Sequence, residues 1–146
     1  MTPHARGMAM REIALRPEFW DELGDFGWLD GGCGIYAEAA AAYLGTTASI
    51  AYVIAEGAGY GPIVDHAVVI AGETVFDGDG ATPLEGFLAA YAAREHHEDA
   101  ILELLDIDDV AADLQLSRQA RELPENASLS ARLAAAWTAE LDGAAR

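Results

Sequence analysis

Apolar side chains recur at helical spacing in several parts of the chain, and this pattern predicts where helices form. We expect helices over residues 12–23 (broken near Pro17), 33–44 (stopped by Gly45), 83–94, 107–114 and 128–141. The helix over 83–94 is expected to have Thr82 as its cap and Pro83 at its first position. Residues 1–10 lack a clear pattern, so we expect them to form a loose tail.

Short apolar runs bounded by glycine predict strands between these helices. Such runs cover residues 49–55 and 65–71, and a return strand over 73–76 follows a turn at Gly72. The glycine-rich segment 57–62 predicts a loop, whereas the run over 99–106 fits a strand or a helix equally well. The order of elements predicts an α+β fold, in which a helix that begins at Cys33 packs on a small, three-stranded antiparallel sheet. Further helices follow in the C-terminal third.

Composition and charge narrow the classes of function. The 146 residues suit one domain, and a hydrophobic content of 52% is enough for one core. The net charge of −17 disfavours direct binding to nucleic acids and to anionic membranes. No run approaches the roughly 20 apolar residues that cross a bilayer, and no secretory signal follows the N-terminus. We therefore expect a cytoplasmic protein that keeps its thiol reduced.

Cys33 is the only cysteine and opens the predicted helix over 33–44. A helix N-terminus lowers the pKa of a thiol and so favours the nucleophilic thiolate. The neighbouring Gly31, Gly32 and Gly34 leave space for a substrate backbone, and the backbone N–H of Cys33 could donate to an oxyanion. These features predict Cys33 as a nucleophile, although a lone cysteine beside glycines is more often a small buried residue.

A histidine and an aspartate flank the predicted hairpin turn at nearly equal distances. His66 precedes it on one strand and Asp77 follows it on the next, so the two side chains can meet across neighbouring strands. His66 would then act as the base for Cys33, and Asp77 would orient its ring. Asp79 is the substitute for Asp77 if the register differs. Together with Cys33, these residues predict a catalytic triad.

The segment from Trp28 to about Glu95 resembles the papain-like and transglutaminase-like cysteine hydrolase fold, and looks like small uncharacterised bacterial and phage proteins of that fold. The resemblance covers about half of the chain and defines a catalytic core over residues 28–95 of one domain, 1–146. It implies Cys33 as nucleophile, His66 as base and Asp77 as orienting residue. Papain-type enzymes place a glutamine before the cysteine, and residues 1–114 contain none. The indole N–H of Trp28 is the candidate to complete the oxyanion hole instead.

Three other features are candidates for minor roles or for none. Glu38 and Tyr60 could contact a substrate, Glu38 from the helix and Tyr60 from a mobile loop over 57–62 that flanks the site. The acidic and histidine-rich residues 96–99 resemble a metal cluster in composition only, and we interpret them as a surface loop. We expect no metal or organic cofactor.

Two functions from different classes remain open at this point. The first is a cysteine-dependent hydrolase or acyltransferase, which could be a peptidase, amidase, deamidase or transglutaminase-like enzyme. It would act on an amide or thioester, including that of a protein side chain, through a thiolate acyl-enzyme. The second is a non-enzymatic acidic binding protein, such as a phage-type inhibitor or a DNA mimic that occupies a basic protein partner, with a vestigial triad.

Overall fold

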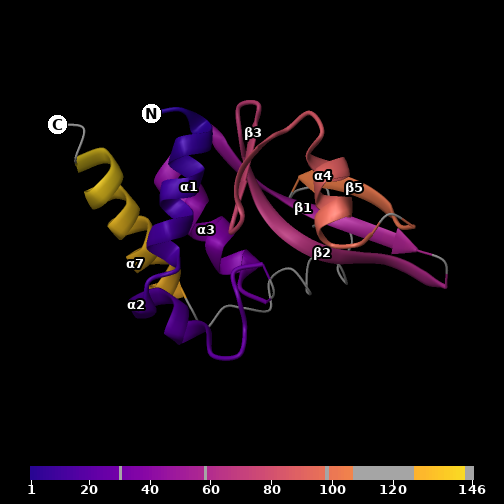
Figure 1. The fold of residues 1–146 in the computed structure, drawn as a ribbon, viewed down its shortest axis with the longest axis horizontal. Coiled ribbons are helices and arrows are strands. Elements are labelled where there is room, and N and C mark those ends of the chain that lie inside the picture. Colours follow the sequence, from indigo (N-terminus) through magenta and orange to yellow (C-terminus); the bar gives the residue numbers. More distant parts are fainter. Residues whose placement is uncertain (30, 58, 98, 107–126, 144–146) are drawn as a thin grey trace.

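The structure is a computed structural model that describes residues 1–29, 31–57, 59–97, 99–106 and 127–143 (Figure 1). Its helices are α1 (Pro3–Ala14), α2 (Pro17–Trp20), α3 (Cys33–Leu44), α4 (Phe87–Arg94) and α7 (Ala127–Trp137), with the short 3₁₀ turn η1 (Asp21–Leu23) and a π-helical end, η3 (Thr138–Asp142). Its strands are β1 (Ala48–Gly57), β2 (Tyr60–Ala71), β3 (Thr74–Asp77), β4 (Gly80–Pro83) and β5 (Ile101–Asp106).

The five strands form one antiparallel sheet in the order β4-β3-β2-β1-β5. The predicted α+β class is confirmed, and α3 packs on the sheet as expected. The sheet is larger than the predicted three strands because the ambiguous run over 99–106 supplies β5, and because residues 80–83, around the expected helix start, form β4. The predicted loop over 57–62 is also mostly strand, since β1 and β2 continue to the pair Gly57 and Tyr60.

Both faces of the sheet are covered by helices (Figure 1). Helices α1, α3 and α7 lie on one face, at the left of Figure 1, and α4 lies on the other. Apolar side chains that alternate along the strands enter the two cores in turn. The first core receives Tyr52, Ala67, Val69 and Phe76, and the second receives Ala51, Val53, Val68 and Val75. This double burial explains why the central strands read as nearly continuous apolar runs.

The N-terminal residues are a helix, so the expectation of a loose tail over 1–10 was wrong. Thr2 caps α1 by accepting a hydrogen bond from the N–H of Ala5 at 3.1 Å. Met10 is fully buried, and the indole of Trp137 donates to its carbonyl oxygen at 3.0 Å. The helix was missed because it packs through small residues: a Cβ on Gly7 would lie 2.5 Å from the Cβ of Ala81. Such close contacts leave no pattern of large apolar side chains in the sequence.

The predicted helix over 83–94 begins later than expected. Thr82 and Pro83 belong to β4, where they pair with Val75 and Thr74 of β3, and α4 begins at Phe87. Proline is tolerated here because β4 is an edge strand, whose outer side needs no hydrogen-bond donor.

The C-terminal helix agrees with the prediction, since α7 and η3 together span Ala127 to Asp142. Leu133 and Trp137 of α7 are fully buried, as the helical spacing indicated. The helix predicted over 107–114 lies outside the described residues. No helix in the described part of the chain is long and apolar enough to span a membrane.

Candidate active site

Cys33 is the first residue of α3, and the loop before it needs glycine at two positions. A Cβ on Gly32 would lie 2.7 Å from the carbonyl oxygen of Gly27, to which the N–H of Gly32 donates at 2.9 Å. Gly31 has a φ of +89°, in the left-handed region that other residues rarely adopt. This compact loop sets the thiol at the N-terminus of α3, where the helix dipole favours a thiolate.

His66 and Asp77 meet between two strands, as the hairpin predicts. His66 Nε2 lies 2.9 Å from Asp77 Oδ2, and the two residues are 1% and 3% exposed. The ladder of β2 and β3 reaches the pair Val69 and Phe76. One position further, Asp77 stands opposite Val68, so His66 is its diagonal neighbour on the same face of the sheet. The hydrogen bond between His66 and Asp77 forms where β3 ends, next to the N-terminus of α3.

The thiol of Cys33 interacts with the imidazole of His66. Burial by itself would raise the pKa of Cys33, but the hydrogen bond to His66 and its charge lower that pKa below its ordinary value. Backbone hydrogen bonds from Ala67 and Gly34 act in the same direction. Because Nε2 of His66 is bonded to Asp77, Nδ1 is the ring nitrogen left for the thiol.

The imidazole of His66 is held in its protonated form. Burial would lower its pKa, but hydrogen bonds to Asp77 and Cys33, and their charges, raise the pKa of His66 to about 9. A lowered thiol pKa beside a raised imidazole pKa favours transfer of the thiol proton to the ring, and so favours a thiolate–imidazolium pair. Such a pair is the activated state of a cysteine nucleophile.

Asp77 is fixed by donors from two further residues. Arg94 Nη2 lies 3.2 Å from Oδ2, and the backbone N–H of Asp79 donates to Oδ1 at 3.0 Å. Burial would raise the pKa of Asp77, but His66, Arg94 and the N–H of Asp79 together lower it. The side chain of Asp79 is exposed and pairs with Arg94 Nη1 at 3.3 Å. Asp79 therefore supports Asp77 rather than replacing it, since the register leaves Asp77 beside His66.

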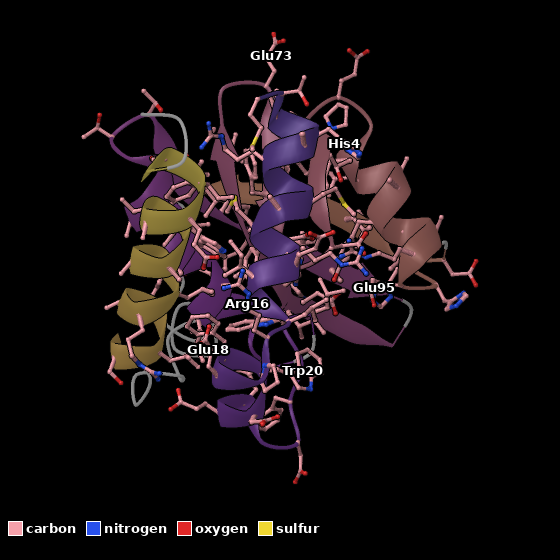
Figure 2. All side chains as sticks on the ribbon, turned by 60° about the vertical axis from the view of Figure 1, so that its left-hand side comes forward. His4, Arg16, Glu18, Trp20, Glu73 and Glu95 are labelled. Carbon is pink, nitrogen blue, oxygen red and sulfur yellow. The ribbon has the colours of Figure 1, made fainter. Side chains whose placement is uncertain are left out.

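Helix α4 covers the far side of His66 with residues that the sequence analysis did not select. The ring of Tyr91 stacks on that of His66 with centroids 5.4 Å apart, and its hydroxyl donates to Asp65. The guanidinium of Arg94 lies 5.1 Å above the Tyr91 ring, and its Nε donates to Glu95, which Figure 2 labels. Helical spacing marked Tyr91 only as a core residue of 83–94, and no sequence signal linked Arg94 to Asp77.

The predicted oxyanion donors behave differently from one another. Trp28 is not available, because its buried Nε1–H donates to the carbonyl oxygen of Ala14 at 2.8 Å. The N–H of Gly32 is also used, by Gly27. The backbone N–H of Cys33 has no hydrogen-bond partner among the described residues, as is usual in the first turn of a helix. Of the candidate donors, it alone remains free within that part of the chain.

The other predicted contacts, Glu38 and Tyr60, belong to α3 and β2, the elements that also carry Cys33 and His66. Glu38 is exposed on α3, one turn beyond Cys33. Tyr60 begins β2, six positions before His66 on the same strand. In the segment 96–99, His97 Nε2 lies 3.1 Å from Asp65 Oδ2 and so joins the surroundings of Tyr91. The described residues contain no group of three or more histidine, cysteine or acidic side chains that could hold a metal ion.

Searches with protein-family models, among curated proteins and among solved structures found no match to this chain. The site consists of a thiol at a helix N-terminus, an imidazole held by a buried carboxylate, and, beside the thiol, a backbone N–H without an acceptor among the described residues.

Proposed function

We propose that the protein is a thiol-dependent acyl-transfer enzyme, a hydrolase or an acyltransferase of the papain-like or transglutaminase-like kind. One observation carries the proposal. His66 stands between the only thiol and a buried carboxylate, and interacts with both. A cysteine that is merely a small core residue does not require a buried imidazole–carboxylate pair.

The proposed reaction starts from the thiolate–imidazolium pair. The Cys33 thiolate attacks the carbonyl carbon of an amide or thioester, and the backbone N–H of Cys33 donates to the oxyanion that forms. When the tetrahedral intermediate collapses, the bond to the leaving amine or thiol breaks, and His66 gives that group its proton. The acyl group remains on Cys33 as a thioester.

The second half of the reaction returns the enzyme to its starting state. His66, now neutral, takes a proton from a water molecule or an acceptor amine as this attacks the thioester. The acid or the new amide leaves, and Cys33 departs as a thiolate beside the protonated His66. Asp77 and Arg94 keep the imidazole oriented through both halves. A reducing compartment such as the cytoplasm suits this chemistry, because oxidation would remove the thiolate.

The first test is the rate at which iodoacetamide alkylates Cys33 as a function of pH. In the wild type we expect the rate to reach a plateau well below the pKa of about 8.5 of a free thiol, because His66 stabilises the thiolate. His66→Ala should return the midpoint to that of an ordinary thiol. His4→Ala is the matched control, since His4 is exposed, and should leave the profile unchanged. A wild-type profile like that of a free thiol contradicts the proposal, provided that circular dichroism shows a folded protein.

The covalent intermediate supplies a second test of the same proposal. A small activated ester, such as 4-nitrophenyl acetate, should acylate the protein once, at Cys33, and intact-mass spectrometry should detect the acetyl group. Cys33→Ala should take up none, and Asp77→Asn should be acylated more slowly because its His66 is less well oriented. Equal acylation of the wild type and Cys33→Ala would show that the label lies elsewhere and would contradict a thiol nucleophile.

A further inference from the structure

A pocket of about 240 Å³ lies on the Asp77 side of the triad. Its walls come from α1 and α2 and from the loops over 27–29 and 78–79. This volume equals that of roughly eight water molecules, and it is below the roughly 300–1,000 Å³ of common cofactor sites. The pocket therefore suits a group the size of an amino-acid side chain.

Most of the wall is apolar and part of it is exposed. Leu15 and Trp20 line the pocket and are 46% and 40% exposed, so a ligand can reach their side chains from solvent. Trp20 lies below the C-terminal end of α1 in the view of Figure 2. Trp28 and Leu29 complete the apolar wall, and the hydrogen bond from Trp28 to Ala14 fixes its indole in place. An apolar or aromatic group is the ligand chemistry that this wall favours.

The pocket also contains a cation, Arg11, that has no ion pair among the described residues. Within the described residues, the arginines Arg6, Arg16, Arg94 and Arg132 each form an ion pair. Arg11 lines the pocket and forms no ion pair in that part of the chain, although the protein has 25 acidic residues. The acidic wall residue Asp79 is already paired with Arg94. A guanidinium left without a carboxylate in so acidic a protein is suited to an anionic group from outside.

Behind Trp28, whose ring contacts that of Tyr36, one buried polar atom has no partner among the described residues. The hydroxyl of Tyr36, on a residue only 1% exposed, has no hydrogen-bond partner within the described residues. It interacts electrostatically with both Arg11 and Asp77, although Tyr36 itself does not line the pocket. Buried polar groups are rarely left without a partner, and such a group is commonly completed by a water molecule or a ligand.

The pocket wall is continuous with the triad. Gly78 and Asp79 line the pocket, and the N–H of Asp79 holds Asp77 Oδ1. A Cβ on Gly78 would lie 2.7 Å from the Cβ of Trp28, so this loop packs directly on the apolar wall. A group in the pocket would therefore contact the loop that positions the catalytic carboxylate.

We propose that this pocket binds an apolar, preferably aromatic, group that carries a carboxylate, with the ring on Trp20 and Trp28 and the carboxylate on Arg11. We further infer that such a group is the recognition element of the acyl substrate, a step that rests on the proposed function. Binding itself needs no thiol, and can be tested separately from catalysis.

The test of binding uses tryptophan fluorescence, since Trp20 and Trp28 both line the pocket. Phenylacetate should change the emission in a saturable way, and phenylacetamide, which has the same shape without the charge, should bind at least about tenfold more weakly. Arg11→Gln should weaken phenylacetate binding to a similar degree. Arg16→Gln is the matched control, because Arg16 pairs with Glu140 and does not line the pocket. Equal binding of the two probes, or no saturable binding, overturns the proposal.

The role in substrate recognition needs a second readout. Saturating phenylacetate should change the rate at which 4-nitrophenyl acetate acylates Cys33 in the wild type, and should have no such effect in Arg11→Gln. An unchanged rate despite binding overturns the substrate role and leaves the pocket standing. Phenylacetate binding should also survive Cys33→Ala, so an unreactive Cys33 with intact binding would refute the proposed enzyme and not the pocket.

Discussion

Asp77 is a buried carboxylate that owes its charge to its neighbours. His66, Arg94 and the backbone of Asp79 all donate to it, and these contacts come from three different elements of the chain. Each donor stabilises the ionised form against the cost of burial. The stability of the fold is therefore coupled to the protonation of the same groups that we propose for catalysis.

This coupling predicts how the stability of the protein depends on pH. The lowered pKa of Asp77 gives a contribution that is present above 3.8 and is lost as the pH falls through the folded value. The raised pKa of His66 gives a contribution that is complete below 6.5 and is lost as the pH rises through about 9. Between 3.8 and 6.5 both are present, and Asp77→Asn should lower the free energy of unfolding by about 3 kcal/mol.

Urea denaturation of the wild type and of Asp77→Asn across this range measures the effect. The difference between the two proteins should shrink as the pH falls from 3.8 through the lowered pKa of Asp77, below which the wild-type carboxylate is neutral like the asparagine. If the difference in the free energy of unfolding stays constant down to the lowest pH, the ionised pair of Asp77 and His66 contributes nothing to the stability of the fold.

The residues of the site differ in how far the sequence could predict them. The bond between His66 and Asp77 followed from local geometry, because both flank one turn at similar distances. The role of Trp28 could not be read in this way, since its indole bonds to α1, whose position depends on packing of small residues. Arg94 reaches Asp77 because α4 packs on the face of the sheet that α1, α3 and α7 leave uncovered. No local sequence pattern predicts this tertiary contact.

Among the elements, α1 connects the N-terminus to the rest of the molecule. Two buried indoles donate to its carbonyl oxygens, Trp28 to Ala14 and Trp137 to Met10. The helix also contributes Arg11 to the pocket and packs against β4. The C-terminal half of α1 thus helps to build the surroundings of the site.

The close approach of α1 to β4 makes Gly7 sensitive to substitution. In Gly7→Ala the new methyl group would meet the Cβ and the backbone nitrogen of Ala81 at 2.5 and 2.6 Å. We expect the clash to cost about 1–3 kcal/mol, more than the gain of about 1 kcal/mol in helix propensity. The matched control is Gly61→Ala, where nothing lies within 4 Å of the new methyl group.

Chemical denaturation of both variants distinguishes these effects. Gly7→Ala should unfold at a lower urea concentration than the wild type, whereas Gly61→Ala should be neutral or slightly more stable. A more stable Gly7→Ala would mean that α1 does not approach β4 as closely as described.

Elements with strong local signals were predicted well, and those defined by their neighbours were not. Helix α3 has a glycine loop before it and Gly45 after it, and both of its bounds agree with the sequence. Strand β4 contains Thr82 and Pro83, which locally favour a helix start, and only pairing with β3 makes it a strand. Strand β5 was ambiguous because a short apolar run has no decisive period.

For the whole molecule, the net charge of −17 is spread over a chain of 146 residues. Repulsion among the acids opposes the compact state, and dissolved salt screens this repulsion. We expect Tm to rise as sodium chloride is increased from low ionic strength to about 0.5 M, a range over which screening becomes short. A relief of about 1 kcal/mol corresponds to about 3–5 °C for a domain of this size.

Tetramethylammonium chloride is the control for specific binding of sodium ions. At the same concentration it has the same ionic strength as sodium chloride, so it screens the repulsion among the acids equally but contains no sodium. Equal increases in Tm support repulsion across the whole surface. A Tm that falls with either salt would show that the exposed ion pairs, such as that of Arg16 with Glu140, outweigh the repulsion.

The single thiol has a practical consequence for anyone who handles the protein. The chain has one cysteine, and that cysteine is the proposed nucleophile. A thiol-specific reagent can therefore attach at most one label to each molecule, and only at Cys33. The fraction of molecules that a thiol reagent labels rapidly, at a pH on the plateau of the alkylation profile, would then measure the fraction of molecules with an activated Cys33. Oxidised copies would remain unlabelled and misfolded copies would react only at the slower rate of an ordinary thiol, so turnover could be normalised to the rapidly labelled fraction without a known substrate.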